Sequence, residues 1–256
     1  MLDIDLSLAE TVLFMVAGIL TGIINTLAGS GSLITLPVFM FICGLSAPAA
    51  NATNRIGVLL QTLVGLIGFH KKGVTDFKGT YWLLLPVIAG AFLGSQIAVG
   101  LDESTMNYTI GGLMVFMFFV LLFRPERWIH ESTVVLKYHR RPLSILAYFL
   151  IGIYGGFIQV GVGIFLLSAL VLISKYTLRA GNGIKTLLVF ALTVPSLFIF
   201  LYHDQVHFGY GILMAVFQSI GAWIGVQFAA RIPNANTWIY RLLIVLVAVS
   251  ALKYFY

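Results

Sequence analysis

The chain has 256 residues, of which 60% are hydrophobic and only 9% are charged, and its formal net charge is +6. A soluble domain usually carries about 25% charged residues, so this chain has too few charges to cover a water-exposed surface. The composition excludes a soluble enzyme and a disordered or fibrous protein. It predicts an all-α integral membrane protein built from many helices.

In chain order, the sequence contains ten apolar segments joined by short polar connections. They cover residues 8–28, 31–44, 49–70, 81–101, 106–123, 143–160, 163–174, 180–202, 208–230 and 237–255. Eight of them have about 18 to 23 residues, enough to cross a hydrocarbon core of about 30 Å. The second and seventh, with about 14 and 12 residues, are too short to cross as helices rising about 1.5 Å per residue. We expect these two to be half-helices or re-entrant arms, which gives eight to ten spans.

The charged residues in the connections alternate in sign along the chain. The basic connections contain Lys71 and Lys72, the residues of the long loop 124–142, Lys175 with Arg179, and Arg231. The intervening connections are acidic or neutral and contain Asp102, Glu103 and Asp204. By the positive-inside rule, the basic connections lie in the cytoplasm and both termini face outward. The positive charge is therefore a topology signal, and we expect a lipid bilayer and no nucleic acid as partner.

Cysteine and histidine usage gives no support for a metal, a cofactor or redox chemistry. The single cysteine, Cys43, excludes an intrachain disulfide, and the five histidines show no ligand-like spacing beyond the pair His203 and His207. Zinc needs three or four convergent ligands, so this pair is more simply explained as solvated loop residues. No nucleophile and base stand at a catalytic spacing either. We therefore expect neither a metal site nor an enzyme acting on lipid or protein.

The two halves of the chain resemble each other, which indicates an internal duplication. The matching positions are Gly29 and Gly31 with Gly161 and Gly163, Asn51 and Asn54 with Asn182 and Lys185, and Gly90 and Gly94 with Gly221 and Gly225. With an odd number of segments in each half, the second repeat is inverted in the membrane. The prediction is one transporter domain with repeats at about 1–123 and 143–256 and a cytoplasmic loop at 124–142. Short, glycine-interrupted segments at equivalent positions of inverted repeats point to a binding site.

The glycine-rich stretch 28–37 has three possible interpretations. It lacks the lysine and the spacing of a nucleotide-binding P-loop. It can be a tight turn between closely packed helices, or a helix interruption whose backbone N–H groups and hydroxyls face a cavity. The counterpart in the second half favours the cavity. The glycine pairs Gly90/Gly94 and Gly221/Gly225, four residues apart, instead favour helix packing.

The ionisable residues inside the apolar segments indicate an anionic substrate. Arg55 and Lys185 lie within segments, whereas no Asp or Glu lies deep in one. A cation exporter or a carboxylate-based proton pump usually buries a carboxylate, so both are disfavoured. The alternative for both cations is that they extend toward the membrane interface.

The runs Leu27–Pro37, Gly44–Pro48 and Ala50–Asn54 resemble the first-half signature of the sulfite exporter TauE/SafE family. The second half is similar to the second repeat of that family at Gly161–Gly163 and Gly181–Asn182, and departs from it at Gln159 where another glycine- and serine-rich run is expected. The resemblance covers essentially the whole chain. It implies a multi-pass permease of the cell inner membrane for a sulfur-containing anion, such as sulfite or an organosulfonate like sulfoacetate.

The candidate substrate site lies between the two halves, where donors surround an anion that offers only acceptors. Its residues are Ser30, Gly31, Ser32, Asn51, Asn54, Arg55, Gln159, Gly161, Gly163, Asn182 and Lys185. We expect the N-termini of the segments that start at 49 and 180 to contribute their positive dipole ends. We also expect the two glycine turns to approach each other, and Lys185 to matter more than Arg55. The alternative function is an anion channel, or a facilitator for another small oxyanion or carboxylate.

Overall fold

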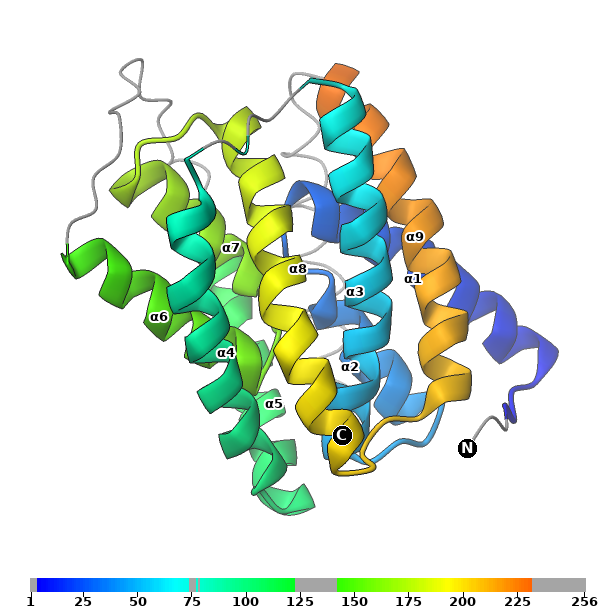
Figure 1. Cartoon of the computed structure of the whole chain (residues 1–256). Coiled ribbons are helices and arrows are strands. Elements are labelled where there is room, and N and C mark those ends of the chain that lie inside the picture. Colours follow the sequence, from blue (N-terminus) through cyan, green and yellow to red (C-terminus); the bar gives the residue numbers. More distant parts are fainter. Residues whose placement is uncertain (1–3, 74–76, 78, 123–141, 232–256) are drawn as a thin grey trace.

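The structure is a computed structural model that describes residues 4–73, 77, 79–122 and 142–231, and these residues form helices and short connections without a strand. The helices are α1 (Leu8–Leu27), α2 (Ser32–Phe41), α3 (Ala47–Lys71), α4 (Leu84–Val99), α5 (Glu103–Leu122), α6 (Pro142–Phe157), α7 (Val162–Ser168), α8 (Leu178–Tyr202) and α9 (Phe208–Arg231) (Figure 1). A 3-10 turn, Tyr81–Leu83, precedes α4, and a π-helical stretch, Ala169–Ile173, continues α7. The first nine predicted segments are confirmed as helices. The tenth lies outside the described residues.

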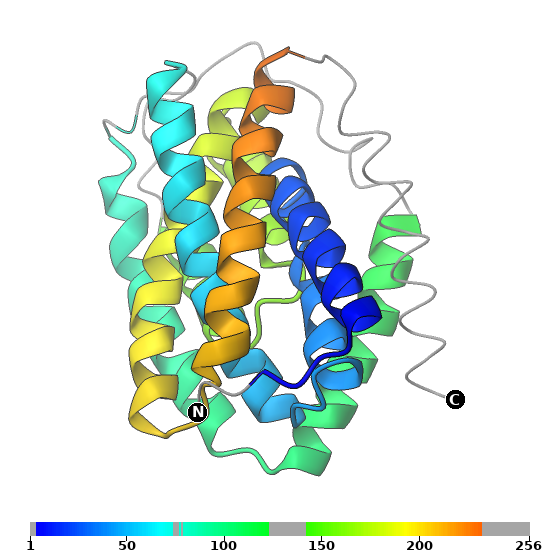
Figure 2. The ribbon, with the colours of Figure 1, turned by 90° about the vertical axis from the view of Figure 1, so that its right-hand side faces the viewer.

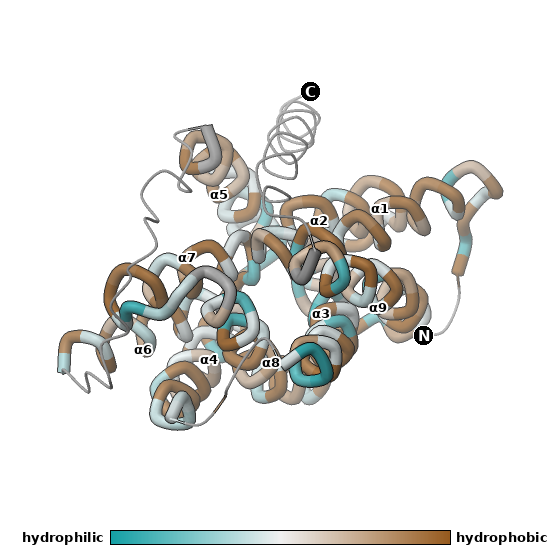
Figure 3. The backbone as a smooth tube through the Cα atoms, turned by 90° about the horizontal axis from the view of Figure 1, so that it is seen from above, coloured by the Kyte–Doolittle hydropathy of each residue, from teal (hydrophilic) through white to brown (hydrophobic). Residues whose placement is uncertain are grey.

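Five helices of the described chain are long and apolar enough to cross a membrane: Leu8–Leu27, Ala47–Lys71, Tyr81–Val99, Ala180–Tyr202 and Phe208–Ala229. Their outward faces carry large exposed apolar side chains such as Leu13, Phe92, Phe198 and Trp223. Viewed along the bundle, most of the helical length is hydrophobic (Figure 3). This is the pattern of a helical protein whose outer surface contacts lipid, and it confirms the predicted all-α membrane protein.

Equivalent helices of the two halves make equivalent contacts with helices of the other half. Helix α1 packs on α9, as Figure 2 shows, and its counterpart α6 packs on α4. Helix α3 packs on α9 as α8 packs on α4, and α3 and α8 contact each other in the centre. In Figure 1, α3 and α9 run upward, whereas α8 and α4 run downward. An inverted duplication predicts this combination of equivalent contacts and opposite directions.

The four paired glycines bring these helices into backbone contact. A Cβ atom added at Gly90 or Gly94 would collide with the α6 backbone, and one added at Gly221 would collide with the backbone of α1. Gly225 also faces α1, where its Cβ would lie 3.0 Å from the side chain of Thr26. Small residues permit such close approach, so the helix-packing interpretation of both pairs is confirmed.

The connections are separated by charge between the two ends of the bundle. The connections from α3 to α4 and from α7 to α8, which contain Lys72 and Lys175, lie at the upper end in Figure 1. Those from α4 to α5 and from α8 to α9, which contain Asp102 and Asp204, lie at the lower end. The separation agrees with the predicted topology. Residues 124–141 of the predicted loop lie outside the described residues, and the assignment of the basic end to the cytoplasm stays a prediction.

Candidate functional site

The two glycine turns that interrupt the helices meet backbone to backbone. Gly29 and Gly161 adopt left-handed conformations, with φ of 78° and 66°, which favour glycine because it lacks a Cβ. The N–H of Gly163 donates to the carbonyl of Gly29 at 3.0 Å. A Cβ added at Gly29 would lie 2.5 Å from the Cα of Gly163, so no side chain fits between the turns. The predicted approach of the turns is confirmed, and their depth in the bilayer stays a prediction.

The start of α2 is fixed to α3 through the Asn54 side chain. The Asn54 Nδ2 donates to the Oγ of Ser32 at 3.1 Å, and the Oγ1 of Thr35 donates to the Asn54 Oδ1 at 2.7 Å. All three side chains are buried. The amide therefore positions the turn at Gly29–Gly31 relative to the central helix α3.

Arg55 of α3 extends to the end of α6. Its Nη1 donates to the carbonyl of Gly155 at 2.6 Å, and its Nη2 donates to the carbonyl of Gly156 at 2.9 Å. The same Nη2 lies 3.4 Å from the Oδ1 of Asn51, whose Nδ2 donates to the Phe157 carbonyl at 3.0 Å. Arg55 is fully buried and its guanidinium lies 5.2 Å from the centre of the Phe200 ring. Asn51 and Arg55 thus bind the end of α6, which leads into the turn at Gly161, and not the turn at Gly29.

Lys185 of α8 reaches the end of α1 in the same manner. Its Nζ donates to the carbonyls of Asn25 at 3.3 Å and Thr26 at 3.0 Å, and to the Oδ1 of Asn182 at 2.9 Å. These three bonds use all three donors of an ammonium group. Only 1% of Lys185 is exposed. The alternative that Arg55 and Lys185 extend toward the interface is therefore wrong.

The contacts correct two details of the predicted site. The sequence match placed Lys185 opposite Asn54, but its contacts make it the counterpart of Arg55, because both cations bind the end of an interrupted helix. The starts of α3 and α8 were expected to converge on the substrate. They lie at opposite ends of the bundle in Figure 1 because the two helices are antiparallel. The helices that begin next to the glycine turns are α2 and α7.

All eleven predicted site residues are buried. Some of their polar atoms have no hydrogen-bond partner: the Oγ of Ser30, the Nε of Arg55 and the Oε1 of Gln159, whose Nε2 donates to Thr193 at 2.6 Å. The prediction missed three further buried residues with unpartnered polar atoms, namely Thr21, Gln61 and Gln218. Gln61 and Gln218 are amides inside apolar segments, and this sequence signal was sufficient to find them.

The buried charge of the described chain is entirely positive. Arg55 and Lys185 are the buried charged side chains of the described residues, and their partners are neutral carbonyl and amide oxygens. The five acidic residues that the structure describes are all exposed: Asp5, Glu10, Asp102, Glu103 and Asp204. The residues that the structure describes contain no cluster of three or more His, Cys, Asp or Glu side chains that could hold a metal ion. The centre of the protein is therefore suited to negative charge.

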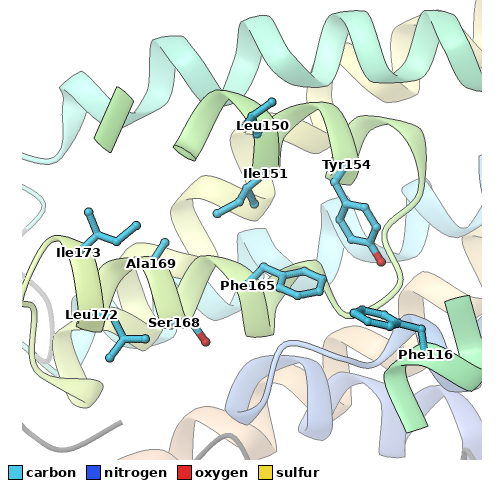
Figure 4. A pocket seen from close by; sticks show the side chains of 9 residues that line it. All are labelled: Phe116, Leu150, Ile151, Tyr154, Phe165, Ser168, Ala169, Leu172 and Ile173. Carbon is cyan, nitrogen blue, oxygen red and sulfur yellow. The ribbon is translucent and has the colours of Figure 1, made fainter. Parts of the chain in front are cut away.

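Two cavities differ sharply in their linings. One of about 10 Å³ adjoins Lys185 and is lined by Asn25, Thr26, Gln61, Thr62, Lys185, Thr186 and Val189. By volume it has room for about one water molecule. A larger pocket of about 510 Å³ lies between α5, α6 and α7, where Tyr154, Phe165 and Phe116 gather (Figure 4). Its lining contains no charged residue, so it is not the candidate site.

Comparison with known proteins gives the same class. The fold and the buried cationic centre define a multi-pass helical membrane protein with two interrupted helices. The model of the family described as sulfite exporter TauE/SafE matches residues 14–254, and the chain belongs to this family.

Curated relatives carry names of the same kind. The chain is 24% identical to "Probable membrane transporter protein YfcA" of Escherichia coli (strain K12), over 96% of this chain and 89% of that protein. It is 24% identical to "Probable membrane transporter protein ORF9" of Sinorhizobium sp, over 88% of this chain and 85% of that protein. A "Probable membrane transporter protein" of Haemophilus influenzae is also 24% identical, with coverages of 88% and 87%. No solved structure gives a significant match. Membrane transport is the function class that the family and these relatives support.

Proposed function

We propose that the protein is a permease of the cell inner membrane for a small sulfur-containing anion, such as sulfite or an organosulfonate like sulfoacetate. The distribution of charge in the protein is the observation that supports an anionic substrate. Arg55 and Lys185 are buried with neutral partners, whereas every acidic residue of the described chain is exposed. Burying an ionised group without a counter-ion is costly, and an anion arriving between the two halves relieves that cost.

The site lies where the two interrupted helices meet, next to Gly29 and Gly163. The unpartnered Oγ of Ser30 and Nε of Arg55 are donors without an acceptor, which is what an oxyanion supplies. The starts of α2 and α7 add their positive dipole ends at the same turns. Lys185 contributes its charge through space, because its three hydrogens already bind oxygens of the protein. The amides around the site hold its parts in place: Asn51 binds the Phe157 carbonyl, Asn54 binds Ser32 and Thr35, Asn182 binds Lys185, and Gln159 binds Thr193.

We expect a transport cycle based on the inverted repeats. In such transporters one repeat moves against the other and opens a central site alternately to either side of the membrane. The preference for a sulfur anion over another oxyanion or a carboxylate rests on the family, whose description names sulfite export. A channel with the same residues is the competing function.

The test is flux into liposomes that contain the purified protein. Labelled sulfite, sulfate, sulfoacetate and taurine are offered separately, and exchange of unlabelled internal anion for labelled external anion is measured. A permease gives saturable uptake and exchange with sulfite or an organosulfonate. Uptake that does not saturate and shows no exchange indicates a channel. Folded protein that moves none of these compounds, or that moves a cation instead, contradicts the proposal.

Two variants of Arg55 test, in the same flux assay, whether this residue belongs to the site. Arg55→Lys keeps the charge but loses the forked donors, so we expect weaker anion affinity with some uptake retained. Arg55→Gln removes the charge, and uptake should fall further. Equal uptake by all three proteins, at equal amounts of monodisperse protein, would remove Arg55 from the site.

A further inference from the structure

The partners of the two buried cations lie at equivalent places. Lys185 binds the carbonyls of Asn25 and Thr26, in the last turn of α1, which ends at Leu27. Arg55 binds the carbonyls of Gly155 and Gly156, in the last turn of α6, which ends at Phe157. The last four carbonyls of a helix have no partner within the helix, and they form the negative end of its dipole. Both cations therefore satisfy the ends of interrupted helices inside the protein.

The two interactions cross between the halves. Arg55 belongs to α3 of the first half and binds α6 of the second, whereas Lys185 belongs to α8 of the second half and binds α1 of the first. We propose that Arg55 and Lys185 are a crossed pair of helix caps, in which each half supplies the cation that ends the interrupted helix of the other half. In this role the two cations position the turns: through these helix ends they hold the turns at Gly29 and Gly161 together. This goes beyond the proposed function and holds whatever anion is carried.

An asparagine about one helical turn before each cation completes the cap. The Oδ1 of Asn182 accepts from Lys185, and the Oδ1 of Asn51 accepts from Arg55. Each cation thus binds two carbonyls of the other half and one amide oxygen of its own helix. An amide oxygen adds an acceptor without adding charge, so the positive charge at the centre remains. This explains why both halves place an asparagine three or four residues before a basic residue.

The two caps differ in their surroundings. The guanidinium of Arg55 lies beside the Phe200 ring, and Gly155, which it binds, faces Leu192 and Val162. The ammonium of Lys185 borders the cavity of about 10 Å³, where both side-chain polar atoms of Gln61 are unpartnered. A water molecule therefore has room near Lys185, whereas apolar side chains surround Arg55. We expect the Lys185 cap to be replaceable by a small amine from solution, and the Arg55 cap to be far less accessible.

Hydrogen exchange of the amides, measured without substrate on detergent-purified protein, tests the crossing. The variants are Lys185→Met and Arg55→Met, in which an unbranched side chain replaces the cation. Lys185→Met should accelerate exchange at the end of α1, in residues 26–31, by about tenfold or more, as expected for losing hydrogen bonds to a charged group. The end of α6, residues 156–161, should change little. Arg55→Met should give the reverse pattern.

Two further measurements keep the proposal testable if a methionine variant is poorly folded. Lys185→Arg keeps a cation and should leave exchange at residues 26–31 within about threefold of the unmodified protein, because a guanidinium also donates to carbonyls. Methylammonium added to Lys185→Ala should restore both slow exchange there and transport, whereas guanidinium added to Arg55→Ala should restore little. Faster exchange confined to the mutated helix, or equal acceleration at both ends, would overturn the crossed caps. So would the absence of any methylammonium effect on folded Lys185→Ala.

Discussion

The contact between the two glycine turns leads to a sharp prediction for Gly163→Ala. The new Cβ would lie 2.6 Å from the Gly29 carbonyl oxygen and 2.9 Å from its carbonyl carbon. These are backbone atoms, and no side chain can rotate away to make room. The two turns must therefore separate, and the hydrogen bond of 3.0 Å between them must lengthen or break.

The expected loss of stability combines three terms. Forcing an extra methyl group into a packed interior costs about 1–3 kcal/mol, and the lost hydrogen bond costs about 1 kcal/mol. Replacing glycine by alanine within a helix returns up to about 1 kcal/mol. The net loss is about 2 kcal/mol, which lowers the midpoint of thermal unfolding by about 4–8 °C in a chain of this size. Anion affinity should fall as well, because separated turns no longer hold the Ser30 hydroxyl in place, and a loss of about 1.4 kcal/mol of binding free energy would be tenfold.

The assay is thermal unfolding in detergent together with anion uptake into liposomes. Gly112→Ala on α5 is the matched control, because a Cβ at Gly112 meets nothing within 4 Å and the residue is exposed. The control should keep its uptake, and its unfolding midpoint should stay the same or rise slightly, because alanine favours the helix. If Gly163→Ala behaves as the control does, the turns are not in tight contact and the site built on them is wrong.

Two further predictions concern the polar centre and the topology. Ser30→Ala removes a buried hydroxyl that has no partner. Thermal stability should therefore stay the same or rise, while anion affinity falls about tenfold. A parallel loss of stability would mean that the hydroxyl has a structural role instead. On a Cys43→Ser background, a membrane-impermeant maleimide applied to intact cells should label Ser104→Cys and not Lys72→Cys, because the basic end of the bundle is cytoplasmic. Labelling of Lys72→Cys alone would invert the topology.

The sequence by itself determined the class of protein and the limits of nine helices. A composition of 60% hydrophobic and 9% charged residues leaves no alternative to the bilayer, and the length of each apolar segment is set by the rise of a helix. The interruptions at Gly29 and Gly161 were also visible, because glycine at equivalent positions of two halves marks a special backbone conformation. Arg55 and Lys185 were identifiable as candidate site residues because a charge inside an apolar segment is costly.

Only the tertiary structure decided what these cations contact. A sequence match pairs positions, and it placed Lys185 opposite Asn54. The antiparallel arrangement of α3 and α8 instead brings Arg55 to the end of α6 and Lys185 to the end of α1. Because of the same arrangement, the helices that begin next to the glycine turns are α2 and α7, and not α3 and α8 as the sequence predicted. Helix direction and the reach of a long side chain are properties of packing between distant segments, and periodicity within one segment does not encode them.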